Sequence, residues 1–165
     1  MRKNSFPSAV PLLLQVLDQG YEKKAWHGPN LKQSLKGVTA REAAWRFHQG
    51  RHNIWEIALH AAYWKYAVRR RLRGDPRGSF PLKGSNWFRR PTVSSERAWR
   101  GDRELLEQEH RKLRQAIAAL ARGKSRDVRW DMVFGVAFHD VYHAGQIRLL
   151  RRLRVASRRR RVHAR

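Results

Sequence analysis

The sequence contains no cysteine. This absence excludes disulfide bonds, thiolate metal sites, iron–sulfur clusters and any cysteine nucleophile. Chemistry that needs sulfur or a soft ligand must therefore use histidine or a thiol supplied from outside the chain. Proline and glycine are also scarce, with 6 and 11 residues among 165, so the chain has too few breakers to be disordered throughout.

Long hydrophobic runs are absent as well. The first apolar stretch, residues 9–17, is interrupted by Pro11 and Gln15 and lacks a small-residue cleavage site, so we do not expect a signal peptide. No run approaches the roughly 20 apolar residues that a membrane-spanning helix needs. We therefore expect a soluble, cytoplasmic protein that has no membrane partner.

Acidic residues are few, with 13 Asp and Glu against 37 Lys and Arg, which leaves a formal net charge of +24. Such a charge favours contact with phosphate-bearing partners. Residues 151–165 alone carry eight Arg and no acid. The other arginines are spread over every segment, however, and no helix-turn-helix, zinc-finger or single-strand-binding motif is present. Nucleic acid is therefore an alternative partner that we do not favour.

The residues that are present predict one all-α domain. Hydrophobic residues make up 41% of the chain, four long stretches show helical periodicity, and none shows the alternation of a half-buried strand. These features predict an up-and-down four-helix bundle. We expect residues 1–154 to form the bundle and residues 155–165 to form a basic, disordered tail. The expected helices span residues 8–24, 53–73, 94–123 and 130–154, with a short helical piece at 39–47.

The buried seam of the last helix is apolar at both ends and polar in the middle, where His139, His143 and Gln146 lie. Burying an imidazole without a partner costs about 1–3 kcal/mol, so these positions need partners inside the core. Residues four apart lie one turn above each other, and two such rings can converge on one metal ion. Two core histidines that hydrogen-bond to neighbouring helices are the other interpretation.

His60 strengthens the metal interpretation because it flanks the apolar stripe of the second long helix. Three histidines from two helices would leave coordination positions open, which is typical of catalytic divalent sites. His48 and His52 have the same spacing as His139 and His143, but Gly50 lies between them, and we interpret them as loop histidines. His110 lies on the seam of the third long helix, either as a core histidine or as a group near the ion.

Two segments resemble the signature helices of the DinB-like superfamily (DinB/YfiT type): NIWEIALHAAYW at 53–64 and FHDVYHAGQI at 138–147. These proteins are four-helix bundles with a three-histidine divalent-metal site, and several relatives are S-transferases or isomerases that use mycothiol, bacillithiol or glutathione. The resemblance covers most of residues 8–154. It implies that His60, His139 and His143 bind one divalent ion, which could be Zn, Ni, Fe or Mn.

Other groups are expected around this ion. Asp140, Tyr142 and Gln146 are candidates for hydrogen bonds to the ligating histidines or for the rim of the pocket, with His110 as a further candidate. Asp140 could instead face solvent and pair with an arginine, and Tyr142 could simply pack. Beyond the metal-bound water or thiol, no catalytic group is identified.

The loop at residues 75–93 is rich in aromatic residues. We expect Phe80, Trp87 and Phe88 to cover part of the pocket at the ion; the alternative is that the loop packs at the opposite end and caps the core.

The expected function is a metal-dependent enzyme that activates a low-molecular-weight thiol or water toward a small-molecule substrate, in the thiol S-transferase or hydrolase class. A basic nucleic-acid-associated bundle and a metal-binding bundle without turnover are the alternatives. Formation of a homodimer is left open.

Overall fold

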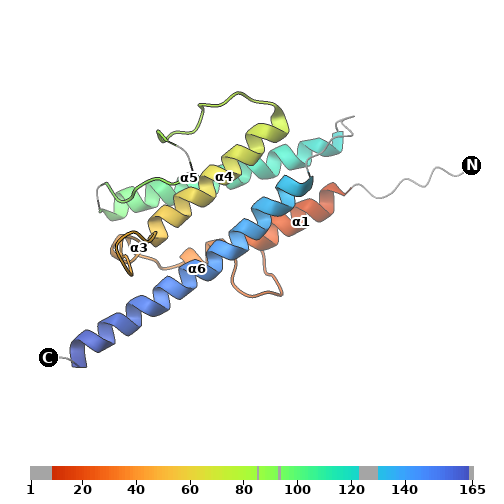
Figure 1. Ribbon diagram of the computed structural model, residues 1–165. Helices are drawn as coiled ribbons and strands as arrows, with labels where there is room; N and C mark the ends of the chain where they lie inside the picture. The colour runs from red at the N-terminus through yellow and green to blue at the C-terminus, as the bar shows by residue number, and fades with distance from the viewer. Residues whose placement is uncertain (1–8, 85, 93, 123–129, 164–165) are drawn as a thin grey trace, which may run out of the picture.

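The computed structural model describes residues 9–84, 86–92, 94–122 and 130–163, and all regular structure within them is helical. No described helix combines the length and the apolar character that crossing a bilayer requires. The prediction of an all-α protein is confirmed. The elements, shown in Figure 1, are α1 (Val10–Tyr21), α2 (Leu31–Leu35), α3 (Ala40–Ala43), α4 (Ile54–Arg73), α5 (Glu96–Ala119), a 3₁₀ turn (Leu120–Arg122) and α6 (Trp130–His163).

The four longer helices α1, α4, α5 and α6 form the predicted four-helix bundle. Both α1 and α4 pack against α5 and against α6, so the four helices enclose a common core. The approach of α1 to α6 depends on Gly20, because a Cβ at this position would lie 2.8 Å from the backbone oxygen of Ala137. The short helix α2 also packs against α6.

The helix directions depart from simple alternation at one connection. Near the start of α4, Trp55 Nε1 donates to Asp102 at 2.7 Å, and near its end Arg69 Nε donates to Glu109 at 3.1 Å, so α4 and α5 run parallel. A parallel pair needs a long crossover, which residues 74–95 supply by returning along the bundle (Figure 1). This crossover is the loop in which the aromatic residues gather.

The start of α4 is fixed by a buried glutamate. Asn53 and Glu56 form a capping box, in which each side chain accepts a hydrogen bond from the other residue's backbone N–H. Glu56 also accepts hydrogen bonds from the Arg46 guanidinium and from the backbone N–H of Arg90. Although burial by itself raises the pKa of Glu56, the hydrogen bonds from Arg46, Arg90 and His52 lower it overall. One carboxylate therefore anchors the loops before and after α4.

The segment before α4 differs from its prediction in two details. Helix α2 was not predicted, although Asn30 and Gln33 form a capping box at its start. The helical piece predicted at 39–47 ends at Ala43. Thr39 caps it, and the carboxylate of Glu42 binds Arg151 of α6 at 3.0 Å. After α3 the chain leaves the helix and Arg46 reaches Glu56.

The predicted end of the last helix at Arg154 is wrong. Helix α6 continues to His163 and extends past the other helices in Figure 1, so residues 155–163 are helical rather than the expected disordered tail. No glycine or proline follows Gly145, and arginine and alanine are good helix formers, so nothing in the sequence stops the helix. Residues 164 and 165 lie outside the described part of the chain.

The role of Glu56 can be tested with Glu56→Gln. We expect this variant to lose about 2 kcal/mol of unfolding free energy at pH 7, because the buried charge-assisted hydrogen bonds are weakened. A carboxyl whose pKa is lowered by folding stabilises the protein above its unfolded pKa, and this stability is lost as the pH falls through its folded pKa. The deficit should therefore shrink on acidification, as measured by urea unfolding between pH 7 and pH 3.

Glu104→Gln serves as the control, because Glu104 is exposed and has no ion-pair partner among the described residues. Equal deficits for the two variants at pH 7, or a Glu56→Gln deficit that does not depend on pH, would contradict this account of Glu56.

Candidate metal centre

Helices α4 and α6 bring His60, His139 and His143 together. The Nε2 atom of His139 lies 3.0 Å from the Nε2 atom of His60 and 3.0 Å from that of His143. His60 and His143 are buried, whereas His139 is half-buried. Three ring nitrogens from two helices thus face one common point, and this group could hold a metal ion.

The outer nitrogens of two of these rings are held by carbonyl oxygens. His60 Nδ1 lies 2.8 Å from the backbone oxygen of Asn86, and His143 Nδ1 lies 2.7 Å from Oε1 of Gln146. The amide of Gln146 is itself oriented by donating from Nε2 to the hydroxyl of Tyr142 at 3.0 Å. Because a carbonyl oxygen only accepts, Nδ1 carries the proton in both neutral rings and Nε2 presents a lone pair.

With this arrangement of protons, the three Nε2 atoms have too few hydrogens to form both of the close nitrogen–nitrogen contacts as hydrogen bonds. The Nε2 atom of His139 can donate one hydrogen at most, to either His60 or His143. In the other nitrogen pair, also 3.0 Å apart, two lone pairs then face and repel each other. A divalent cation held by all three nitrogens would remove this repulsion. The donor set therefore fits a metal ion.

The histidines are uncharged at neutral pH. Burial lowers the pKa of His60 to about 4 and the pKa of His139 to about 3. Protonation of His143 or His60 would oppose protonation of His139, and the ammonium of Lys65 lowers the pKa of His139 further. Burial also lowers the pKa of His143. Since a metal ion binds the neutral imidazole, little proton competition is expected near pH 7.

The crossover loop covers the group through Asn86 and Trp87. The Trp87 ring stacks on His60 at 3.7 Å between centroids, and its other face stacks on His52 at 3.6 Å. Asn86 has a φ of 66°, a left-handed conformation that asparagine tolerates, and its side chain accepts from Trp64 Nε1 at 2.9 Å. Of the three loop aromatics singled out in the sequence, Trp87 therefore lies against the histidines.

The other two loop aromatics pack elsewhere. Phe80 and Phe88 lie against Tyr63, with ring centroids 5.5 and 5.8 Å away, and Phe80 also contacts Tyr66. They extend the core cluster on α4 and do not contact the three histidines.

The remaining candidates have mixed outcomes. Gln146 holds His143, and Tyr142 is exposed and holds Gln146, as described above. Asp140 is buried and accepts a hydrogen bond from Lys65 Nζ, not from an imidazole. The expectation that Asp140 hydrogen-bonds to a ligating histidine is therefore wrong. His110 stacks on Tyr21 at 3.9 Å, on α5, apart from the three histidines. His48 is exposed in a loop.

His110 belongs to a second polar group, with Asp18 and Glu22. Its Nε2 lies 4.0 Å from Asp18 and 3.9 Å from Glu22, looser spacings than among the three histidines. Both carboxylates already have a cation as partner, since Arg114 binds Asp18 at 2.9 Å and Lys32 binds Glu22 at 3.2 Å. A metal ion is therefore favoured at His60, His139 and His143.

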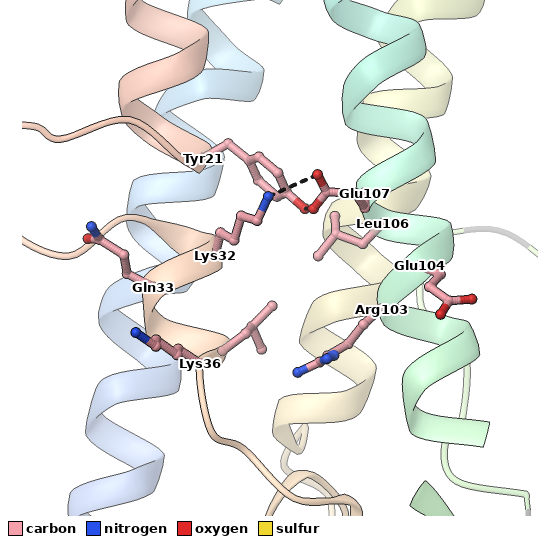
Figure 2. A pocket seen from close by; sticks show the side chains of 9 residues that line it. Tyr21, Lys32, Gln33, Lys36, Arg103, Glu104, Leu106 and Glu107 are labelled. Carbon is pink, nitrogen blue, oxygen red and sulfur yellow. Dashed lines mark hydrogen bonds and ion pairs between the residues drawn. The ribbon is translucent and has the colours of Figure 1, made fainter. Parts of the chain in front are cut away.

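Two cavities differ in their relation to the histidines. A cavity of about 260 Å³ lies between α4 and α6 and reaches His139; Trp64, Val68, Val136 and Met132 make it apolar, and Arg71 also lines it. A cavity of about 380 Å³ lies between α1, α2 and α5 and is drawn in Figure 2; none of the three histidines lines it. Of these two cavities, only the first adjoins one of the three histidines.

Two residues that position the candidate centre were missed in the sequence. Lys65 lies on the buried side of α4, four residues after Ala61 of the apolar stripe, and a lysine at that position was a readable signal for a buried partner. Asn86 carried no such signal, because its contact with His60 depends on the path of the crossover loop.

Comparison with known proteins agrees with the fold and the histidine geometry. The DinB superfamily matches residues 25–147, a segment that covers most of the chain and contains His60, His139 and His143. The chain therefore belongs to the DinB superfamily. No curated protein and no solved structure matches it.

The pair formed by Lys65 and Asp140 is testable because both side chains are fully buried. Removing one partner leaves an uncompensated buried charge, so Lys65→Met should cost about 3–5 kcal/mol of unfolding free energy. The double variant Lys65→Met/Asp140→Leu should recover a large part of that loss, as measured by denaturant unfolding in a double-mutant cycle. Lys36→Met, at an exposed lysine, is the control. Additive losses in the cycle would show that the two charges do not depend on each other.

Proposed function

We propose that this protein is a divalent-metal-dependent enzyme that joins a low-molecular-weight thiol to an electrophilic small molecule. The observation that carries the proposal is the set of three Nε2 atoms facing one point, with the Nδ1 protons of two rings held by carbonyl oxygens. Membership of the DinB superfamily supports the same chemistry.

A divalent ion held by neutral imidazoles lowers the pKa of a bound thiol or water and so makes a nucleophile available near pH 7. The chain contributes the rest. Asn86 and Gln146 fix the orientation of two rings, and Trp87 shields one face of His60 from water. Three protein ligands leave coordination positions open, which is typical of a catalytic rather than a structural site.

The surroundings of the site support an external thiol and an apolar acceptor. Because the sequence has no cysteine, the sulfur nucleophile must come from a second substrate. The apolar cavity beside His139 is of a size to hold a small ring or alkyl group, and Arg71 in its lining suits an anionic substituent. In the transfer, a sulfur–carbon bond forms, the bond from that carbon to its leaving group breaks, and the thiol proton passes to solvent.

Metal binding is the first test. Protein purified without a histidine tag should carry or take up about one equivalent of Zn, Ni, Fe or Mn, as measured by elemental analysis after dialysis. His139→Ala should lose most of that metal, because its Nε2 is the atom shared by both close nitrogen pairs. His48→Ala, at an exposed loop histidine, should keep it. Equal metal content in the two folded variants would contradict the proposed centre.

Thiol transfer is the second test, with 1-chloro-2,4-dinitrobenzene as electrophile and glutathione, bacillithiol or mycothiol as thiol, followed by absorbance. Metal-loaded protein should accelerate conjugation with at least one thiol, and His60→Ala should lower the rate about 100-fold or more, whereas His48→Ala should not. Arg71→Ala should mainly raise KM for an electrophile that carries a carboxylate. Acceleration of 4-nitrophenyl acetate hydrolysis without any thiol reaction would replace the transferase proposal by a hydrolase.

A further inference from the structure

A further cleft, of about 360 Å³, lies between α3, the loop that follows it and the C-terminal part of α6. We call it the α3–α6 cleft. Four arginines line it together with serine hydroxyls and two aromatic rings: Arg41, Arg46, Arg154, Arg158, Trp45 and Phe47. The extension of α6 beyond Arg154, which the sequence did not predict, is what brings Arg158 to this cleft.

Positive charge in the α3–α6 cleft is not balanced. No acidic residue lines it. Glu56 neutralises Arg46, and Arg154 lies 3.5 Å from Glu42, which it shares with Arg151. Within the described part of the chain, Arg41 and Arg158 have no carboxylate partner. An anion in the cleft could therefore bind at least two guanidinium groups that are not already paired with a carboxylate.

The arginines of the cleft also repel one another. Burial lowers the pKa of Arg154, and the charges of Arg158 and Arg41 lower it further, with only partial compensation from Glu42. A shift in this direction means that the nearby charges make the protonated form of Arg154 less favourable. A bound anion would relieve this repulsion.

The cavity in Figure 2 gives a useful contrast. It also has basic residues in its lining, but Glu104 and Glu107 lie among them, and Lys32 is already bound to Glu107 at 2.9 Å. Two carboxylates offset most of the positive charge of its three basic residues, so it attracts an anion less strongly. The absence of acidic lining residues distinguishes the α3–α6 cleft from it.

We propose that the α3–α6 cleft binds a small phosphate monoester whose organic part is flat and apolar. A phosphate dianion presents three oxygens, which suits Arg41, Arg154 and Arg158, because guanidinium groups bind phosphate through directed hydrogen bonds. Trp45 and Phe47, whose ring centroids lie 6.2 Å apart, provide an apolar wall for the organic part, and Phe47 is 55% exposed. The volume is that of a small-molecule site.

This site is separate from the proposed metal centre. Arg154 follows His143 by 154 − 143 = 11 residues on the same helix, which places them about 16 Å apart along its axis. None of the three histidines lines the cleft. Phosphate binding should therefore not depend on metal, and the two proposals can fail independently.

The test is calorimetric titration of the full chain with phenyl phosphate, inorganic phosphate and phenol, in the presence and absence of EDTA. We expect phenyl phosphate to bind more tightly than inorganic phosphate, phenol not to bind, and EDTA to change nothing. Arg158→Ala should weaken phenyl phosphate binding about tenfold or more, through loss of a charge-assisted contact. Arg159→Ala is the matched control, because Arg159 is the exposed neighbour of Arg158 on α6 and does not line the cleft.

Phe47→Ala tests the apolar wall. It should lower the affinity for phenyl phosphate to that for inorganic phosphate and leave inorganic phosphate unaffected. Circular dichroism confirms that each variant remains folded. The proposal is overturned if phenyl phosphate does not bind, or if Arg158→Ala and Arg159→Ala weaken binding equally. It is also overturned if a 20-nucleotide single strand binds and its affinity falls equally in both variants, since that result means general attraction to a basic surface.

Discussion

The buried ion pair between Lys65 and Asp140 is the interaction on which the site depends most. Moving either charge out of water costs several kcal/mol, and this cost is offset only when the two charges meet in good geometry. Helix α4 therefore has one favourable register against α6, and sliding by a turn would leave both charges unpaired. That register sets His60 opposite His139 and His143. The ammonium of Lys65 also lies 4.8 Å from the Tyr21 ring, which ties α1 to the same level of the bundle.

The crossover at residues 74–95 is the second constraint, and it follows from the parallel order of α4 and α5. A connection that must return along the bundle passes beside α4, and here it is held there at two points. Glu56 accepts from the backbone N–H of Arg90 near the start of α4, and His60 holds the carbonyl of Asn86 one turn later. The loop thereby places Trp87 on His60. Asn86 and Trp87 of this loop thus form a wall of the candidate site.

Much of this arrangement could be predicted from the sequence, and the residues show why the rest could not. Asn53 with Glu56 marked the start of α4, and Gly74, with a φ of 72°, marked its end, because such signals act within one turn of the chain. His139 and His143 were conspicuous as polar residues in an apolar seam. By contrast, Asp140 pairs with Lys65, which is 75 residues away in the sequence, and Glu42 pairs with Arg151, which is 109 residues away. Local periodicity carries no information on such pairs, so the partner of Asp140 emerged only from the structure.

The net charge of +24 bears on both proposed sites in opposite ways. A positive protein repels a divalent cation at long range, yet salt screens that field within about 8 Å at physiological ionic strength. Binding of a cation at the histidines would therefore depend on the three nitrogens themselves, whose neutral state is maintained chiefly by burial. The same charge attracts anions, including low-molecular-weight thiols, which commonly carry carboxylates, and phosphate esters. Specific binding requires more than this attraction: it needs several guanidinium groups that line one cleft and lack acidic partners, and Arg41 and Arg158 meet that condition in the α3–α6 cleft.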